Sequence, residues 1–296
     1  QTVAVGTWMW VDGDVGPADE ARIGALDRGL LLGEGVYDTC SVVDGMPFAL
    51  TRHLARLRRS AAIVGIDVPW SDSAIRAACA RTVGAALVGR TGTPSPDDAV
   101  GRLRITVTGG VGPLGPLRGS ARPSLIVAVG PAPKRGETAA VSVVAGVRNP
   151  AAPTVGAKVT SALDLVLALA AAQRRGADEA ILTTPAGHLA EGSGSNLFLV
   201  VDGRLATPDL ATGCLPGVTR DLVLELLDGT DLGIDLRADL TVADLHGASE
   251  AFLTSTTRRV QAVASVDGTA LGAAPGPVTA AVLERFAALE ASTIDP

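Results

Sequence analysis

The stretch PTVGAKVTSALDLVLALAAAQRRGADEAILTT, residues 153–184, places a helix and a strand in direct succession. Its apolar residues between Leu163 and Ala172 predict a helix over 162–175, and residues 180–183 predict a buried strand. The same alternation recurs along the chain. Further strands are predicted over 7–11, 40–43, 103–107, 124–129, 140–147, 197–201 and 251–253, and further helices over 51–64, 71–88, 218–227 and 277–290. Interleaved strands and helices of this kind indicate a mixed α/β fold.

The 296 residues are enough for two domains. Pro131–Gly136 is rich in proline and glycine and is typical of a linker. We therefore expect a small N-terminal domain over 1–130, an interdomain linker over 131–137, and a larger domain over 138–296.

Composition excludes several classes of protein. The chain is 47% hydrophobic, which favours a globular protein. Its net charge of −6 argues against nucleic acid as a binding partner. No apolar run is long enough to cross a membrane, and no segment resembles a signal peptide. Three cysteines, Cys40, Cys79 and Cys214, are too few and too scattered for a zinc cluster. We expect a cytoplasmic protein with no metal.

Lys134 and Lys158 are the only lysines in a chain with 25 basic residues. Arginine keeps its proton near neutral pH whereas lysine can release it, so a lysine retained among arginines is a candidate for catalysis. Lys134 lies in the linker-like stretch. Lys158 lies at the edge of the apolar run and could act as a nucleophile or base; the alternative is a surface lysine that packs its stem on apolar neighbours.

Three features are suited to binding phosphate. Leu215-Pro-Gly-Val-Thr-Arg220 places a glycine just before a predicted helix, where free N–H groups and the helix dipole attract anions. Thr254-Ser-Thr-Thr257 puts four hydroxyls directly after a predicted strand. Arg56 could add a bidentate positive charge. Ordinary helix caps and turns are the alternative interpretation of the first two features.

Glu191 opens the loop Glu191-Gly-Ser-Gly-Ser-Asn196. A carboxylate in such a loop is usually solvated. Together with Lys158, however, it would complete the charges that pyridoxal phosphate (PLP) requires, because a lysine holds the aldehyde carbon of PLP and a carboxylate keeps its ring nitrogen protonated.

These residues occur in an order that resembles the fold-type IV PLP enzymes, the class IV aminotransferases. The matching segments are Asp27–Gly29, Gly33–Thr39, His53–Leu57, Lys158, Glu191–Asn196, Pro216–Arg220 and Leu253–Thr257. The resemblance implies a small α/β domain and a larger one with the cofactor between them, and a homodimer. It also implies that Lys158 is the Schiff-base lysine and Glu191 the partner of the pyridine nitrogen. The phosphate would then be surrounded by Arg56, Val218, Thr219, Ser255 and Thr256.

The branch of the family is less clearly indicated. The branched-chain enzymes carry a tyrosine soon after the catalytic lysine, and residues 159–163 contain none. Tyr37, the only tyrosine, is similar to the substrate-binding tyrosine of the D-amino acid transaminases, which also use an arginine from the loop after the 103–107 strand; Arg118 is the nearby candidate. Thr39 resembles the aminodeoxychorismate lyases instead.

We therefore predict a PLP-dependent transaminase that acts on D-amino acids and a 2-oxo acid. Its substrate would be bound by Tyr37, Thr39 and Arg118. The resemblance leaves (R)-amines open as further donors. The alternative is an aminodeoxychorismate lyase that releases p-aminobenzoate and pyruvate.

Overall fold

The computed structural model describes residues 6–89, 100–119 and 121–296. The chain divides into two compact units. Unit 1 comprises Gln1–Lys134, Ala157–Ser161 and Thr293–Pro296, and unit 2 comprises Arg135–Gly156 and Ala162–Ser292. The expected domains are each one continuous stretch, whereas both units are assembled from separate segments. The segment that carries Lys158 belongs to unit 1.

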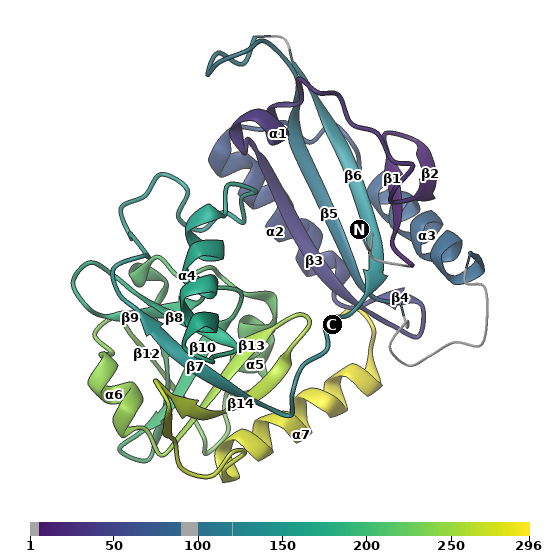
Figure 1. The fold of residues 1–296 in the computed structure, drawn as a ribbon. Coiled ribbons are helices and arrows are strands. Elements are labelled where there is room, and N and C mark those ends of the chain that lie inside the picture. The colour runs from purple at the N-terminus through teal and green to yellow at the C-terminus, as the bar shows by residue number, and fades with distance from the viewer. Residues whose placement is uncertain (1–5, 90–99, 120) are drawn as a thin grey trace. The chain divides into compact units, whose positions relative to one another are not determined.

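Unit 1 is an antiparallel sheet whose two long helices pack on one face (Figure 1). The strands lie in the order β2-β1-β6-β5-β3-β4. Their bounds are β1 Trp8–Val11, β2 Asp14–Pro17, β3 Gly35–Val43, β4 Met46–Pro47, β5 Val100–Val111 and β6 Arg122–Pro131, and the helices are α1 Arg28–Leu32, α2 Leu50–Val64 and α3 Asp72–Val88.

Side chains of β3 and β5 alternate between the two faces of this sheet. Val36, Cys40, Leu103 and Ile105 are buried in one core with apolar residues of α2 and α3. Tyr37 and Thr39 point to the opposite face, because they are the intervening residues of β3. The register pairs Thr39 with Arg104 of β5, so Arg104 lies on that same opposite face.

Helix α2 begins without a side-chain cap of its own. Its N-cap residue, Ala49, has a left-handed φ of 54° and offers no acceptor. The last residues of the chain supply the acceptors instead: Thr51 N donates to Asp295 Oδ1 over 2.9 Å, and Ala49 N donates to Ile294 O over 2.8 Å. A distant segment therefore satisfies N–H groups that the start of a helix leaves without partners.

Unit 2 contains a larger, mixed sheet with strand order β12-β11-β10-β13-β14-β7-β8-β9, and β15 pairs with β14. Strand β7 runs parallel to both β8 and β14, as β11 does to β12, and the other pairs are antiparallel. The strands are β7 Thr138–Val144, β8 Glu179–Thr183, β9 Leu189–Gly192, β10 Asn196–Val201, β11 Arg204–Pro208, β12 Ile234–Arg237, β13 Glu250–Ser255, β14 Arg259–Val266 and β15 Thr269–Ala270. The helices are α4 Leu163–Arg174, α5 Val218–Leu227, α6 Val242–Gly247 and α7 Pro277–Ser292, with a 3-10 turn at Leu210–Thr212.

The mixed α/β, two-part architecture predicted from the sequence is confirmed. The long helices and buried strands lie within a few residues of their predicted positions. The sequence pattern did not predict the short helices α1 and α6 or the strands β2, β4, β9, β11, β12, β14 and β15. Among the described residues, none of the helices has the length and apolarity needed to cross a membrane. All three cysteines are free and buried.

Candidate active site

Lys158 and Tyr37 lie together in unit 1. Tyr37 N donates to Lys158 O over 3.0 Å, and Lys158 N donates to Ser60 Oγ over 3.0 Å. The backbone N–H and the carbonyl of Lys158 are therefore both held by hydrogen bonds. Lys158 Nζ is 4.6 Å from the centroid of the Tyr37 ring. Arg104 Cζ is 3.5 Å from the same centroid. Two cations therefore contact one phenol ring, within the range of cation–π attraction.

These two cations change the acidity of Tyr37. Burial by itself would raise the pKa of the phenol, but the positive charges of Lys158 and Arg104 outweigh burial, and the pKa is lowered from 10.0. Burial also lowers the pKa of the Arg104 guanidinium, although Tyr37 opposes that effect. The cluster thus combines an amine, an acidified phenol and a guanidinium, which suits it to bind a carboxylate and to transfer protons.

A buried ion pair lies on the other face of β3. Asp38 accepts from Arg56 Nε over 2.9 Å and from Arg56 Nη2 over 2.7 Å, and its Oδ1 is 2.7 Å from His53 Nδ1. Burial opposes ionisation of Asp38, but the Arg56 and His53 charges prevail, and the pKa of the carboxyl is lowered far below 3.8. The predicted phosphate ligand Arg56 is therefore oriented by Asp38, a partner that the sequence reading did not identify.

Glu191 forms the centre of a second cluster, in unit 2. Its Oε1 is 2.9 Å from Arg148 Nε, and its Oε2 accepts from Leu215 N over 2.9 Å. Arg148 Nε also donates to Gly213 O over 2.6 Å. The carboxylate is buried at the end of strand β9 and bonded at both oxygens. It is thus a fixed negative charge of the kind that keeps a ring nitrogen protonated, rather than the solvated loop residue of the alternative interpretation.

The start of α5 has the features of an anion site. Its N-cap, Gly217, provides no side-chain cap, and the first helical residues, Val218 and Thr219, are buried. A Cβ on Gly217 would lie 2.0 Å from Asn196 Oδ1. Asn196 is held in turn, because its Nδ2 donates to Leu215 O over 2.9 Å. Backbone N–H groups at such a glycine-started helix fit a phosphate.

The hydroxyls of the second phosphate motif lie at the end of β13. Ser255 is the last residue of that strand and Thr256 follows in a turn. Ser255 Oγ accepts from Arg258 N over 3.3 Å. Within the described residues, the buried hydroxyl of Thr254 has no hydrogen-bond partner. An orphaned hydroxyl beside two partly exposed ones fits the binding of an anion at this strand end.

Arg118, the predicted substrate-binding arginine, contacts helix α2. Its guanidinium donates to Val64 O and to Gly65 O over 2.5 and 2.6 Å, and it also pairs with Glu34. These contacts engage Arg118 with the C-terminal end of α2. Arg104 is the arginine that contacts Tyr37, and the sequence reading missed it. The available signal was its position in the 103–107 strand, where a charge interrupts apolar residues.

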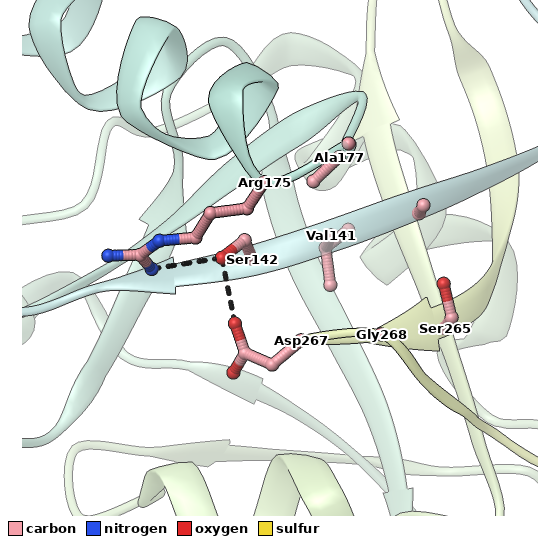
Figure 2. A pocket seen from close by; sticks show the side chains of 9 residues that line it. Val141, Ser142, Arg175, Ala177, Ser265, Asp267 and Gly268 are labelled. Atoms are coloured by element: carbon pink, nitrogen blue, oxygen red, sulfur yellow. Dashed lines mark hydrogen bonds between the residues drawn. The ribbon is translucent and has the colours of Figure 1, made fainter.

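A separate pocket of unit 2 has a volume of about 170 Å³ and contains none of the predicted site residues (Figure 2). Ser142 Oγ donates to Asp267 Oδ1 over 2.7 Å and accepts from Arg175 Nη1 over 3.1 Å. Three polar side chains of the lining, those of Ser142, Arg175 and Asp267, are thus bonded to one another.

Known proteins are similar to this chain over almost its whole length. The model of the family described as amino-transferase class IV matches residues 35–266. A putative branched-chain-amino-acid aminotransferase of Methanocaldococcus jannaschii is 31% identical over 284 residues, 94% of each chain. A D-alanine aminotransferase of Bacillus licheniformis is 31% identical over 264 residues, 88% of this chain and 89% of its own.

A solved structure extends this likeness to the fold. The T.th. branched-chain amino acid aminotransferase, complexed with N-(5'-phosphopyridoxyl)-L-glutamate, superposes with a TM-score of 0.79 at 27% identity. The match covers 98% of this chain and 95% of that one.

Proposed function

Since this chain belongs to the class IV aminotransferases, which depend on PLP, we propose that it transfers the amino group of a D-amino acid to a 2-oxo acid. The observation that carries the proposal is the cluster of Tyr37, Arg104 and Lys158, which puts a carboxylate-binding pair beside a reactive amine. Its chemistry matches what a transaminase requires of an amino acid, namely a held carboxylate and a proton acceptor.

Each unit by itself contains groups that suit a part of PLP. Lys158 offers the amine that binds its aldehyde carbon, and Glu191 offers the negative charge for its ring nitrogen. Val218 and Thr219, at the uncapped start of α5, and Ser255 and Thr256, at the end of β13, suit its phosphate. PLP bound there would supply the electron sink for the reaction and the carrier for the transferred amino group.

The chain's own residues then have separable tasks. Arg104 and Tyr37 hold the substrate carboxylate, with Arg104 in the role that the resemblance suggested for Arg118. Lys158 would take up the proton from the substrate carbon that bears the nitrogen and hold it on its amine for the later protonation. Arg56 contributes positive charge toward the phosphate, and Asp38 keeps its guanidinium in place.

D-Amino acids are favoured by two observations. Tyr37 is similar to the tyrosine that helps to hold the carboxylate in D-amino acid transaminases, and no tyrosine follows Lys158 as in the branched-chain branch. The 31% identity with a D-alanine aminotransferase is consistent with this choice. The second candidate is transamination of L-branched-chain amino acids, favoured by a similar relative of that name at equal identity and 94% coverage. Because Thr39 resembles the aminodeoxychorismate lyases, the aminodeoxychorismate lyase activity is included in the test as a third candidate.

One assay panel separates these activities. The purified enzyme is supplied with D-alanine, D-glutamate, L-leucine, an (R)-arylalkylamine or aminodeoxychorismate, and 2-oxoglutarate or pyruvate is the acceptor. We expect D-alanine or D-glutamate to convert the bound cofactor from its aldehyde to its amine absorbance. Conversion by L-leucine alone would assign the branched-chain activity. Release of p-aminobenzoate and pyruvate from aminodeoxychorismate alone would assign the lyase.

Lys158 is tested independently of the substrate. The purified protein is expected to be yellow, and borohydride is expected to abolish the near-visible absorbance and leave the cofactor on the peptide that contains Lys158. Lys158→Ala should carry no covalent cofactor, whereas Lys134→Ala, the matched control, should behave as the wild type. A wild type that gains no chromophore from added PLP would refute the assignment.

We also propose a homodimer, formed through an apolar surface of unit 1. Arg28 of α1 donates to the carbonyl oxygens of Gly115, Pro116 and Leu117 over 2.9–3.1 Å, so this loop is held against α1. Leu114 and Leu117 of the loop are 77% and 80% exposed, and α1 exposes Leu30, Leu31 and Leu32. Exposed leucines on two segments that are held together in this way are typical of an interface.

Sedimentation should give about twice the 29.8 kDa chain mass. The double variant Leu114→Asp and Leu117→Asp should shift the protein toward the monomer. The control is Val88→Asp, which alters an exposed apolar residue at the end of α3. A wild type that is active as a monomer would contradict the homodimer.

A further inference from the structure

We propose that the buried Glu179–Arg258 ion pair is a positioning element that joins the Glu191 loop to the turn after Ser255, so that both ends of the cofactor site are fixed together. The inference rests on the proposed use of Glu191, Ser255 and Thr256 for PLP. Neither Glu179 nor Arg258 is placed against the cofactor itself.

Glu179 opens strand β8, and its carboxylate is almost fully buried. It accepts hydrogen bonds from the hydroxyls of Ser193 and Ser195, the latter over 3.1 Å. These two serines belong to the loop between β9, which carries Glu191, and β10, which begins at Asn196. The carboxylate of Glu179 therefore anchors the loop between Glu191, the predicted partner of the ring nitrogen, and Asn196, which packs against Gly217 at the start of α5.

The loop has little freedom to adjust. Gly192 N donates to Ser195 O over 2.7 Å, and Ser193 N donates to Ala180 O over 2.9 Å. A Cβ on Gly192 would lie 2.2 Å from Ser195 Oγ. Because the backbone packs this closely, a displaced serine must move the neighbouring residues of the loop, Glu191 and Asn196 included.

Arg258 connects the same carboxylate to the second phosphate motif. Its Nη2 donates to Glu179 Oε2 over 2.9 Å, and its backbone N donates to Ser255 O over 3.1 Å. Its Nη1 donates to Gln261 Oε1, and Gln261 Nε2 in turn donates to Gly136 O over 2.7 Å. The turn after Ser255 is therefore tied to both β8 and the start of β7.

The pair acts on the site by holding geometry. The side chains of Glu179 and Arg258 are only 3% and 2% exposed. Loss of one charge would leave the other buried without compensation, which forces local rearrangement. Because the serine loop and the turn share this carboxylate, such rearrangement should affect the nitrogen end and the phosphate end of PLP at the same time.

The test compares Glu179→Gln with Glu250→Gln. Glu250 is a matched control, because it is a buried carboxylate of unit 2 whose oxygens accept from Val278 N and Thr279 N at the start of α7. Two properties of the holoenzyme are measured: the rate of PLP loss on dilution, and the pH midpoint of the bound chromophore's near-visible absorbance. Thermal unfolding of each variant is recorded beside them.

We expect Glu179→Gln to lose PLP at least about tenfold faster than the wild type, because the contacts to the phosphate change. We also expect its pH midpoint to shift, because the surroundings of the PLP ring change at the same time. Glu250→Gln should be destabilised yet keep both cofactor properties. Ser193→Ala, which retains the ion pair and removes one loop contact, should lose PLP about threefold faster, in keeping with one hydrogen bond. This milder variant keeps the test decisive if Glu179→Gln does not fold.

Wild-type release rates and midpoints in both Glu179→Gln and Ser193→Ala would overturn the proposal. Equal acceleration in Glu250→Gln would also overturn it, because general loss of stability would then explain the effect. A wild type that binds no PLP would refute the proposed function instead, before any variant is compared.

Discussion

The substitution Asp38→Asn tests the buried ion pair beneath Tyr37. Asp38 is fully buried and accepts two bonds from Arg56, one from Thr39 N and a contact from His53. Asparagine has nearly the same shape as aspartate but carries no charge. Its NH₂ group would replace a carboxylate oxygen that accepts hydrogen bonds, so that two donors would face each other. Arg56 is then left as a buried charge without its counter-ion.

The size of the effect follows from these contacts. A hydrogen bond to a charged group contributes about 1.5–3 kcal/mol, and Asp38→Asn impairs both bonds from Arg56. Removing one partner of a buried pair costs a similar total, about 3–5 kcal/mol. The free energy of unfolding of a whole domain is only about 5–15 kcal/mol. We therefore expect Asp38→Asn to lower the free energy of unfolding at pH 7 by about 3–5 kcal/mol.

Urea unfolding at pH 7 measures this loss, and Asp72→Asn is the control. Asp72 pairs with Arg58 at the surface, where both side chains are more than a third exposed, so its loss should cost less than about 1 kcal/mol. Because folding lowers the pKa of Asp38 below its ordinary 3.8, its contribution is complete above pH 3.8 and is lost as the pH falls through the folded value.

The difference between wild type and Asp38→Asn should accordingly be the same at pH 5 and pH 7. An Asp38→Asn protein within about 1 kcal/mol of the wild type, or no more affected than Asp72→Asn, would refute the assignment of the pair as a buried, ionised contact.

Three further outcomes are expected. Because Tyr37 is the only tyrosine, an ultraviolet pH titration should show its phenolate forming below pH 10. Arg104→Met should move the midpoint of this titration upward. An unchanged midpoint would contradict an effect of the Arg104 charge on the Tyr37 phenol. Asp295→Ala should lower the free energy of unfolding by about 1 kcal/mol in a urea titration, because Thr51 N at the start of α2 loses its acceptor. An unchanged urea midpoint would show that this hydrogen bond does not stabilise the fold. Gly217→Ala should cost about 1–3 kcal/mol and weaken PLP binding in a fluorescence titration, since its Cβ collides with Asn196; wild-type affinity would argue against a phosphate site there.

The sequence was most informative where a residue type carries its chemistry by itself. Lys158 is conspicuous because arginine replaces lysine almost everywhere else, and Gly217 before a helix predicts an anion site that the sequence cannot distinguish from an ordinary helix start. The long helices were predicted because their amphipathic faces repeat over many residues, whereas β9, β12 and β15 are four residues or fewer and offer too short a pattern.

Partners were not predictable, since they depend on register and packing. Arg104 contacts Tyr37 because β3 and β5 pair Thr39 with Arg104, and a shift of one residue would turn Arg104 into the core. Arg118, which was predicted to bind the substrate, contacts the end of α2.

The sequence by itself thus determined the class of enzyme and identified Lys158 as the candidate reactive amine. Only the tertiary structure decided how their charges are compensated: Asp38 with Arg56, Arg148 with Glu191, and Glu179 with Arg258, residues separated by 18 to 79 positions. The physical reason is that a charge can be buried only beside a partner, and distant segments become neighbours only when the sheets assemble.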